Sequence, residues 1–292
     1  MRTSLHLGTA VCLAVLWGAV PAAAQTCNGF TCTILGTSGA DTLTGTSGPD
    51  VICGLASNDT INGGGGDDII CGDAGADQIH GDNGSDFLVG AAGSDTLDGG
   101  AGTDTAAWFS SVTASLTTGF ATEGADTDTL TAVENLQGSD SADTLTGDAS
   151  ANILDGQGGD DVIRGEDGND TLIGRNGNDQ LTGGNGADSL SGVGGTDTAI
   201  WETTITASLT TGTASDGDTL SGIENLTGST GNDALEGDGN NNVLTGGTGV
   251  DFLDGKGGTD TCDAGPPFGR VGVPDPDSCT DACETRIGCT LL

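Results

Sequence analysis

The sequence predicts an all-β solenoid built from nine-residue repeats. Aspartate recurs at every ninth position from Asp41 to Asp104, and Leu or Ile follows each of the first seven of these aspartates by two residues. The residues before each aspartate are rich in Gly, Asp and Asn, which tolerate the positive φ angles of tight turns. A unit with a single inward apolar side chain cannot bury it alone, so successive units must stack on one another.

Two further blocks keep the same phase, which gives 19 units in all. A strand alternates faces, so we expect the eighth residue of each unit to point inward and the seventh and ninth to point outward. The sixth positions, counted through the three blocks, are Asp41, Asp50, Asp59, Asp68, Asp77, Asp86, Asp95, Asp104, Asp143, Asn152, Asp161, Asp170, Asp179, Asp188, Asp197, Asp233, Asn242, Asp251 and Asp260.

Residues 1–24 are predicted to be a secretory signal peptide. Arg2 supplies a positive start, an apolar stretch follows, and the three alanines at 22–24 offer a cleavage site. A membrane anchor needs about 20 apolar residues, and Gly18 and Pro21 interrupt this stretch. We therefore expect a secreted protein, extracellular or associated with the cell surface, that does not insert into the membrane.

The charge of the chain points to cations as partners. Removal of residues 1–24 takes away Arg2 and no acidic residue, so the formal charge becomes −38. Such a chain repels nucleic acid and anionic lipid, and it repels itself when compact. The 55 glycines and the 3% aromatic residues are by themselves typical of disorder. One carboxylate at a fixed place in each unit is instead typical of a metal-binding repeat.

The unit is clearest in Gly63-Gly64-Gly65-Gly66-Asp67-Asp68-Ile69-Ile70-Cys71, which reads G-G-x-G-x-D-x-U-x with U a large aliphatic residue. The chain thereby resembles the hemolysin-type (RTX) calcium-binding repeat family. The resemblance implies a right-handed parallel β-roll in which two units form one coil, so that each unit stacks on the unit 18 residues away. It also implies that calcium lies between successive turns on one edge, held by the sixth-position side chains and by backbone carbonyl oxygens.

All 19 sixth-position residues are thus predicted calcium ligands, and the pairs of units that stack directly allow at most about 13 calcium ions. Full occupancy would change the formal charge from −38 to −12. We expect the metal-free roll to be unfolded by carboxylate repulsion and calcium binding to supply the folding energy. Asn152 and Asn242 offer an oxygen but no charge, which predicts weaker sites there.

The repeats are interrupted twice. We divide the chain into an N-terminal cap (25–35), repeat blocks (36–107, 138–200 and 228–263), spacers (108–137 and 201–227) and a Cys-rich C-terminal cap (264–292). Both spacers begin with tryptophan and share the segments Ala-Ser-Leu-Thr-Thr-Gly, Asp-Thr-Leu and Glu-Asn-Leu, which indicates a super-repeat of about ninety residues. Each spacer is predicted to form a strand pair or an extended excursion beside the roll. Asp128 and Asp218 are either further ligands or solvated turn residues.

Eight cysteines remain after residues 1–24, an even number that indicates disulfides in an exported protein. Cys53 and Cys71 stack on one outer face, which favours a bridge between them. A Cys27–Cys32 bridge would close the N-terminal turn. Cys262 is expected to join a stapled C-terminal cluster; the alternative, a zinc site, lacks a nearby histidine. The candidate members of that cluster are Cys279, Cys283 and Cys289.

The sequence shows no catalytic constellation, because the mature chain has only His80 and Lys256 as possible basic partners for a nucleophile. In the family that this chain resembles, the repeats are often the C-terminal part of toxins, proteases or lipases. Here the repeats fill nearly all of the mature sequence. We expect a structural or adhesive protein. The alternative is calcium-dependent binding of polysaccharide or ice through outward threonines at the seventh position, such as Thr42, Thr60, Thr96, Thr171 and Thr198.

Overall fold

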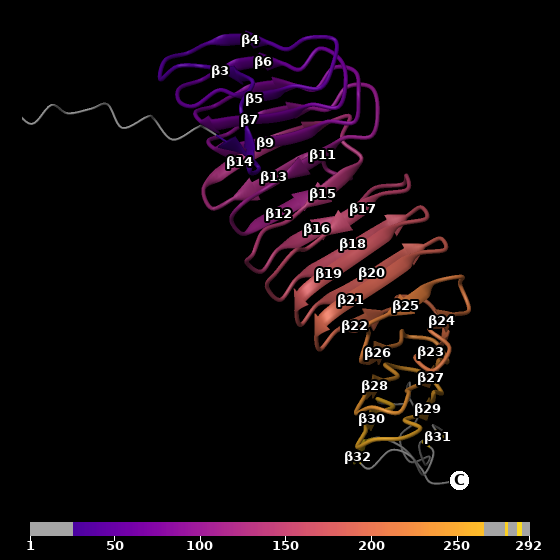
Figure 1. Ribbon diagram of the computed structural model, residues 1–292. Helices are drawn as coiled ribbons and strands as arrows, with labels where there is room; N and C mark the ends of the chain where they lie inside the picture. Colours follow the sequence, from indigo (N-terminus) through magenta and orange to yellow (C-terminus); the bar gives the residue numbers. More distant parts are fainter. Residues whose placement is uncertain (1–25, 266–277, 280–284, 288–292) are drawn as a thin grey trace, which may run out of the picture.

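The chain forms a parallel β-solenoid with two long sheets facing each other (Figure 1). The computed structural model describes residues 26–265, 278–279 and 285–287. Within these described residues each sheet has 15 strands, and the chain passes from one sheet to the other at nearly every turn. The predicted all-β solenoid of nonapeptide repeats is confirmed. No helix in the described residues is long and apolar enough to cross a membrane.

Sheet 1 has, in spatial order, β3 (Ile34–Leu35), β5 (Val51–Cys53), β7 (Ile69–Ala74), β9 (Phe87–Ala92), β11 (Thr105–Ala107), β15 (Asn135–Gln137), β17 (Ile153–Asp155), β19 (Thr171–Gly177), β21 (Ser189–Gly195), β25 (Thr219–Ser221), β24 (Thr213–Ala214), β23 (Thr206–Ser208), β27 (Ala234–Glu236), β29 (Phe252–Asp254) and β31 (Ser278–Cys279).

Sheet 2 has β4 (Thr42–Thr44), β6 (Thr60–Asn62), β8 (Gln78–His80), β10 (Thr96–Asp98), β14 (Asp126–Thr131), β13 (Phe120–Glu123), β12 (Val112–Ser115), β16 (Thr144–Thr146), β18 (Val162–Asp167), β20 (Gln180–Asn185), β22 (Thr198–Ile200), β26 (Asn225–Thr227), β28 (Val243–Thr245), β30 (Thr261–Asp263) and β32 (Thr285–Ile287). A separate antiparallel hairpin, β1 (Thr26–Cys27) and β2 (Phe30–Thr31), precedes them.

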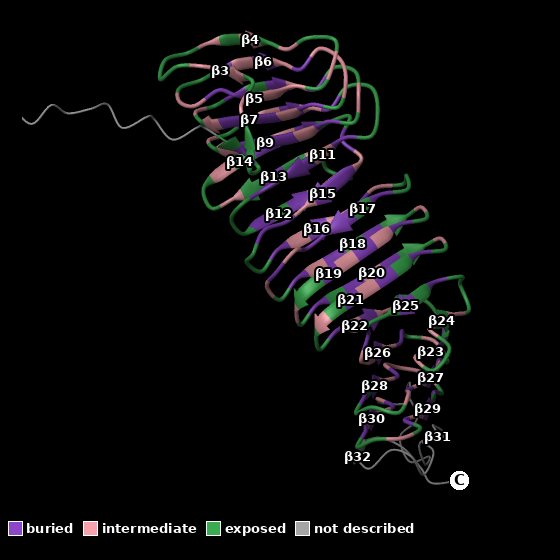
Figure 2. Ribbon diagram, viewed as in Figure 1, coloured by how far each residue is buried: buried purple, intermediate pink, exposed green. Residues whose placement is uncertain are grey.

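The stacking follows the 18-residue period. Ile61 pairs with Ile79 in sheet 2, and Ile70 pairs with Leu88 in sheet 1, so each eighth-position side chain lies on the one two units away. These side chains are fully buried between the sheets and form one continuous core column. Figure 2 shows the resulting alternation of buried and less buried residues along the strands. The core therefore holds the turns at both edges in register.

Turn glycines are needed where successive turns come closest. Gly177, at the fourth position of its unit, has a φ of 137°, and a Cβ added to it would lie 1.7 Å from the carbonyl oxygen of Gly159. The stacked turns thus leave no room for a side chain at this position, and the backbone conformation also disfavours one.

Gly177→Ala is therefore expected to destabilise the roll by about 2 kcal/mol or more, since the turn must move away from its neighbour. The calcium concentration at the midpoint of folding, followed by circular dichroism, should rise. Gly48→Ala is the matched control, because a Cβ on Gly48 would meet no atom within 4 Å. Equal midpoints for the two variants would contradict the close approach.

Each spacer is built into a sheet. In the first, β13 runs antiparallel between β12 and β14, while β14 pairs in parallel with β10 and β12 with β16 (Figure 1). In the second, β23, β24 and β25 do the same between β21 and β27. The strand-pair prediction is thus refined: the added strands extend the sheet itself instead of lying beside the roll.

The two related spacers lie in opposite sheets, sheet 2 for the first and sheet 1 for the second. The eight strands from β15 to β22 separate them. Because consecutive nonapeptide strands alternate between sheets, an even number brings the chain to the second spacer in the other sheet. Each spacer adds two extra strands on one side, so the two additions balance and both sheets have 15 strands.

The predicted N-terminal disulfides are wrong in their pairing. Cys53 and Cys71 are adjacent in register, as expected, but the bridges are Cys27–Cys71 and Cys32–Cys53, with Cα separations of 5.8 and 6.0 Å. Parallel in-register side chains keep their Cβ atoms near the strand spacing of about 4.8 Å, which exceeds the usual Cβ separation of a disulfide. The β1–β2 hairpin instead folds over the outer face of sheet 1 and supplies the partners.

This hairpin covers a second apolar cluster, formed by Cys27, Cys53, Cys71, Val89 and Ala107. At the other end, Cys262 is buried in the core column and disulfide-bonded. The side chains of the other three C-terminal cysteines lie outside the described residues, as does the predicted signal peptide.

Candidate metal sites

The sixth-position side chains form a hydrogen-bonded ladder along both edges of the roll. The Oδ1 atom of Asp77 accepts the backbone N–H of Asp59 at 2.7 Å, and Asp95 accepts that of Asp77 at 2.8 Å. On the other edge Asp86 accepts the N–H of Asp68 at 2.8 Å. Each carboxylate is thereby fixed against the turn 18 residues earlier, which is the stacking that the sequence predicts.

The second carboxylate oxygen has no hydrogen-bond donor at most of these positions. The Oδ2 atom is buried and without a hydrogen-bond partner at Asp59, Asp68, Asp77, Asp86, Asp95, Asp104, Asp161, Asp170, Asp179, Asp188 and Asp197. These side chains are at most 2% exposed. A buried anionic oxygen without a donor is costly, so eleven of them in register indicate a missing cationic partner.

The first-position glycines leave the space that a cation needs. A Cβ added to Gly72 would lie 2.3 Å from Oδ2 of Asp77 and 3.0 Å from the carbonyl oxygen of Gly90 in the next turn. Gly63 is placed in the same way, with Oδ2 of Asp68 at 2.5 Å and the carbonyl oxygen of Gly81 at 2.6 Å. Carboxylate and carbonyl oxygens thus converge where any side chain would block them. Such an all-oxygen environment suits calcium.

Side chains alone do not complete a coordination shell. In the described part of the chain, no group of three or more His, Cys, Asp or Glu side chains is arranged to hold one metal ion. Calcium takes six or more oxygens at about 2.3–2.6 Å, including backbone carbonyls. The glycine-rich turns, rather than additional acidic residues, must therefore supply the remaining ligands.

Burial makes these carboxylates hard to ionise when no cation is present. Desolvation raises the pKa of Asp86 to about 6, of Asp95 to about 7 and of Asp161 to about 8, and the backbone hydrogen bond to each partly offsets this effect. Neighbouring carboxylates in the ladder raise the pKa values further. A divalent cation at the same place would favour the charged forms.

The first unit of each block differs, as does Asp50 in the second unit of the first block, whose Oδ2 accepts the backbone N–H of Thr46 at 2.6 Å. Oδ2 of Asp41 accepts the backbone N–H of Thr37 at 2.6 Å. Oδ2 of Asp143 accepts that of Ser139, and Oδ2 of Asp233 accepts that of Ser229, both also at 2.6 Å. At these positions the carboxylate is held by its own turn.

The side-chain amides of Asn152 and Asn242 each accept a hydrogen bond through Oδ1 and donate one through Nδ2. Asn152 Oδ1 accepts the N–H of Asp148 at 2.8 Å, and its Nδ2 donates to the carbonyl oxygen of Glu134 at 2.7 Å. Asn242 makes the equivalent bonds with Asp238 and Glu224. The weaker calcium sites predicted there stay a prediction, but the polar groups of both side chains already have backbone partners.

Sequence reasoning missed Glu134 and Glu224, which continue the ladder. Glu134 Oε2 accepts the N–H of Asp104, and Glu224 Oε2 accepts that of Asp197, both at 2.8 Å. The repeat spacing does indicate both residues, because each lies nine residues before the sixth position of the next unit. Because each follows a shortened turn, the extra methylene of glutamate reaches the same donor.

Asp128 and Asp218 also belong to the ladder. Both are 1% exposed, so their interpretation as solvated turn residues is wrong. Asp128 accepts the N–H of Asp95 at 3.0 Å and Asp218 that of Asp188 at 2.9 Å. Desolvation raises the pKa of Asp218 to about 6, with its backbone hydrogen bond opposing the shift.

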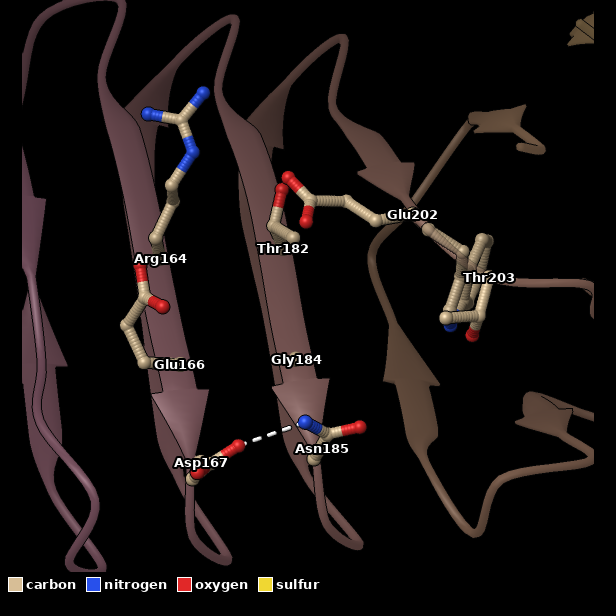
Figure 3. Close-up of a pocket in the computed structure, with 9 residues that line it drawn as sticks. Arg164, Glu166, Asp167, Thr182, Gly184, Asn185, Glu202 and Thr203 are labelled. Atoms are coloured by element: carbon tan, nitrogen blue, oxygen red, sulfur yellow. Dashed lines mark hydrogen bonds between the residues drawn. The ribbon is translucent and has the colours of Figure 1, made fainter. Parts of the chain in front are cut away.

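A polar pocket lies on the outside of sheet 2 (Figure 3). Arg164 and Thr182 project from β18 and β20, Glu202 and Thr203 follow β22, and Asn185 Nδ2 donates to Asp167 at 2.7 Å. The threonine hydroxyls in this lining have no imidazole or amine beside them that would activate a nucleophile. None of the buried ladder carboxylates is among the residues that line this pocket.

The family model for RTX calcium-binding nonapeptide repeats matches residues 35–70, 72–106, 128–163, 137–172, 164–199, 216–253 and 227–262. The chain belongs to this family. Its RTX repeats cover both edges described above, and the early part of each spacer, around 108–127 and 201–215, lies between the matched segments. No curated protein matches the chain. RTX nonapeptide repeats bind Ca²⁺, which agrees with the oxygen-lined spaces between the turns of this RTX protein.

Proposed function

We propose that this protein is a secreted calcium-binding RTX protein with a structural or adhesive role, whose roll folds as several calcium ions bind between stacked turns. The row of buried Oδ2 atoms carries the proposal. Of the 13 stacked pairs that the phase defines, eleven end in one of these aspartates, and the other two end in Asp251 and Asp260. The unsatisfied oxygens therefore coincide with the pairs expected from the sequence.

The chain's own groups have distinct roles in this proposal. The sixth-position Oδ1 fixes each turn on its neighbour, while Oδ2 and the turn carbonyl oxygens face the space that the first-position glycine leaves open. A bound calcium ion would supply the positive charge that these oxygens need. The core column holds successive turns at the spacing that brings the oxygens together.

Calcium content tests the proposal directly. Equilibrium dialysis of the mature chain should give several ions and at most about 13. Asp77→Asn should remove one or two ions, because Asp77 belongs to the pairs with Asp59 and with Asp95. Asp82→Asn, the same charge change at an exposed turn residue, is the control and should remove none. A wild-type chain without bound calcium would refute the proposal.

Secretion and a non-catalytic role are parts of the same proposal. The signal-like residues 1–24 support export, and the two disulfides near the N-terminus suit an oxidising compartment. Detection of the chain in culture medium, with its N-terminus near residue 25, tests export. A chain retained in the cell with residues 1–24 intact would contradict it.

The outer face of sheet 2 favours one alternative function, calcium-dependent binding of polysaccharide or ice. Thr42 and Thr60 are direct neighbours on β4 and β6, and Thr96 and Thr198 lie on β10 and β22 of the same sheet. Thr171 lies on sheet 1 instead. A glycan array and an ice-recrystallisation assay, both with calcium present, discriminate the alternatives. Silence in both favours the structural role.

A further inference from the structure

At both spacers a tryptophan contacts the carboxylate oxygen that has no hydrogen-bond donor at the eleven ladder positions described above. Asp128 keeps the usual Oδ1 bond to the N–H of Asp95, but its Oδ2 accepts the indole Nε1–H of Trp108 at 3.0 Å. Asp128 and Trp108 are each 1% exposed. The indole thus satisfies the oxygen that would otherwise face a cation.

The second spacer repeats this arrangement in the other sheet. Oδ2 of Asp218 accepts the indole Nε1–H of Trp201 at 3.1 Å, while its Oδ1 accepts the N–H of Asp188 at 2.9 Å. Trp201 is 4% exposed and Asp218 is 1% exposed. The same substitution of a donor for a cation therefore occurs twice in the chain.

The first-position glycine of the regular units is also missing before these two aspartates. In the regular units, glycine five residues before the aspartate leaves the site open, whereas Glu123 and Thr213 stand at that distance before Asp128 and Asp218. Asp128 follows the hairpin between β13 and β14 instead of a glycine-rich turn. The carbonyl oxygens that would complete a calcium shell are therefore not positioned by such a turn.

On the opposite edge of each spacer, the ladder is also continued by hydrogen bonds within the protein. Glu134 uses its carboxylate for the N–H of Asp104 and its backbone carbonyl oxygen for the amide of Asn152. Glu224 does the same with Asp197 and Asn242. Protein donors thus serve the ladder on both edges at the same level of the roll.

We propose that each spacer is a metal-free joint, in which the indole N–H of tryptophan and the side-chain amide of asparagine donate hydrogen bonds where calcium would otherwise bind, so that the ladder is divided into three separate calcium arrays. The arrays lie within residues 41–104, 143–197 and 233–260. This inference rests on the proposed calcium function and specifies which levels of the ladder bind no calcium. The neutral donors continue the stacking without adding a cation, and they isolate the ions of one array from those of the next.

The test measures calcium content at saturating calcium in the mature chain by equilibrium dialysis and atomic emission. Asp128→Asn should bind as many ions as the wild type, whereas Asp77→Asn, the same change inside an array, should bind one or two fewer. Because an asparagine amide would face the Trp108 N–H donor to donor, a second variant combines Trp108→Phe with Asp128→Asn. It removes that conflict and should also keep the full ion count, with circular dichroism verifying its fold.

Loss of one or more ions in the folded double variant would overturn the inference, because Asp128 would then be a calcium ligand. The matched pair Trp201→Phe and Asp218→Asn repeats the test in the other sheet. An absence of calcium from the wild-type chain has a different meaning, since it would refute the proposed function itself. Unchanged counts at both joints, together with the loss in Asp77→Asn, would establish three arrays.

Discussion

Removal of calcium from the mature chain is expected to unfold the roll. In its described part, the structure buries eleven sixth-position Oδ2 atoms that have no hydrogen-bond donor. An unsatisfied buried polar group costs about 1–3 kcal/mol, and more when it is charged. Their combined cost exceeds the net stability of about 5–15 kcal/mol that is usual for a folded domain. Metal binding then has to supply the folding energy, as it does in other small metal-dependent modules.

Far-UV circular dichroism with a chelator, followed by added calcium, measures this effect. We expect most of the β signal to be lost in chelator and to return cooperatively with calcium. Magnesium at the same concentration is the control and should restore much less, because its small octahedral shell fits carbonyl-rich turns poorly. A β spectrum that is identical with and without chelator would contradict calcium-driven folding.

The stability of the roll is expected to depend on pH with opposite signs in the absence and presence of calcium. Without calcium, burial raises the pKa of Asp170 and Asp197 to about 6, of Asp95 to about 7 and of Asp161 to about 8. Unfolded aspartate titrates near pH 4. The contribution of these groups to metal-free stability is therefore complete below about pH 4 and is lost as the pH rises toward about 8.

With calcium present the direction reverses. Calcium ligands must be deprotonated, so acidification weakens metal binding, and the stability that binding provides falls with it. In chelator, the residual far-UV β signal should then decrease from pH 5 to pH 8, whereas urea unfolding in calcium should show stability increasing over the same range. The same sign in both series would contradict an assignment of calcium to the buried carboxylates.

Asp161→Asn isolates the largest contribution. This variant removes a carboxyl whose pKa burial raises to about 8, so the metal-free series should become flatter between pH 6 and pH 8. Asp140→Asn, at an exposed turn, should leave the slope unchanged. Because the sequence pI is about 4.1, low protein concentration and a sedimentation control are needed at the acidic end.

Local periodicity was sufficient for the repeat architecture and for most of the candidate sites. The ninefold phase, together with the two-unit coil that the family resemblance implies, places Ile61 above Ile79 and Asp77 between Asp59 and Asp95. Such positions are predictable because each unit contacts mainly the units stacked on it, so sequence spacing translates directly into distance. The same phase also includes Glu134, where glutamate stands in place of aspartate nine residues before Asp143.

The tertiary structure decided what depends on contacts outside the period. The disulfides are one example: Cys27 and Cys32, which lie at the N-terminal hairpin and outside the regular repeats, bond to Cys71 and Cys53. The number of strands between the spacers, not the spacer sequences, set them in opposite sheets. The meeting of Trp108 with Asp128, 20 residues away, required the antiparallel strands that bring them together.

The sequence by itself thus determined a stack of nine-residue units, since one aliphatic side chain per unit is buried only when units stack, and the resemblance to RTX repeats added the two-unit coil with carboxylates along both edges. Only the folded chain showed which carboxylate oxygens stay without a donor and which receive an indole or amide hydrogen. The reason is physical: a repeat fixes the relation between neighbouring turns, whereas a hydrogen bond from an inserted segment depends on how the whole insertion is folded.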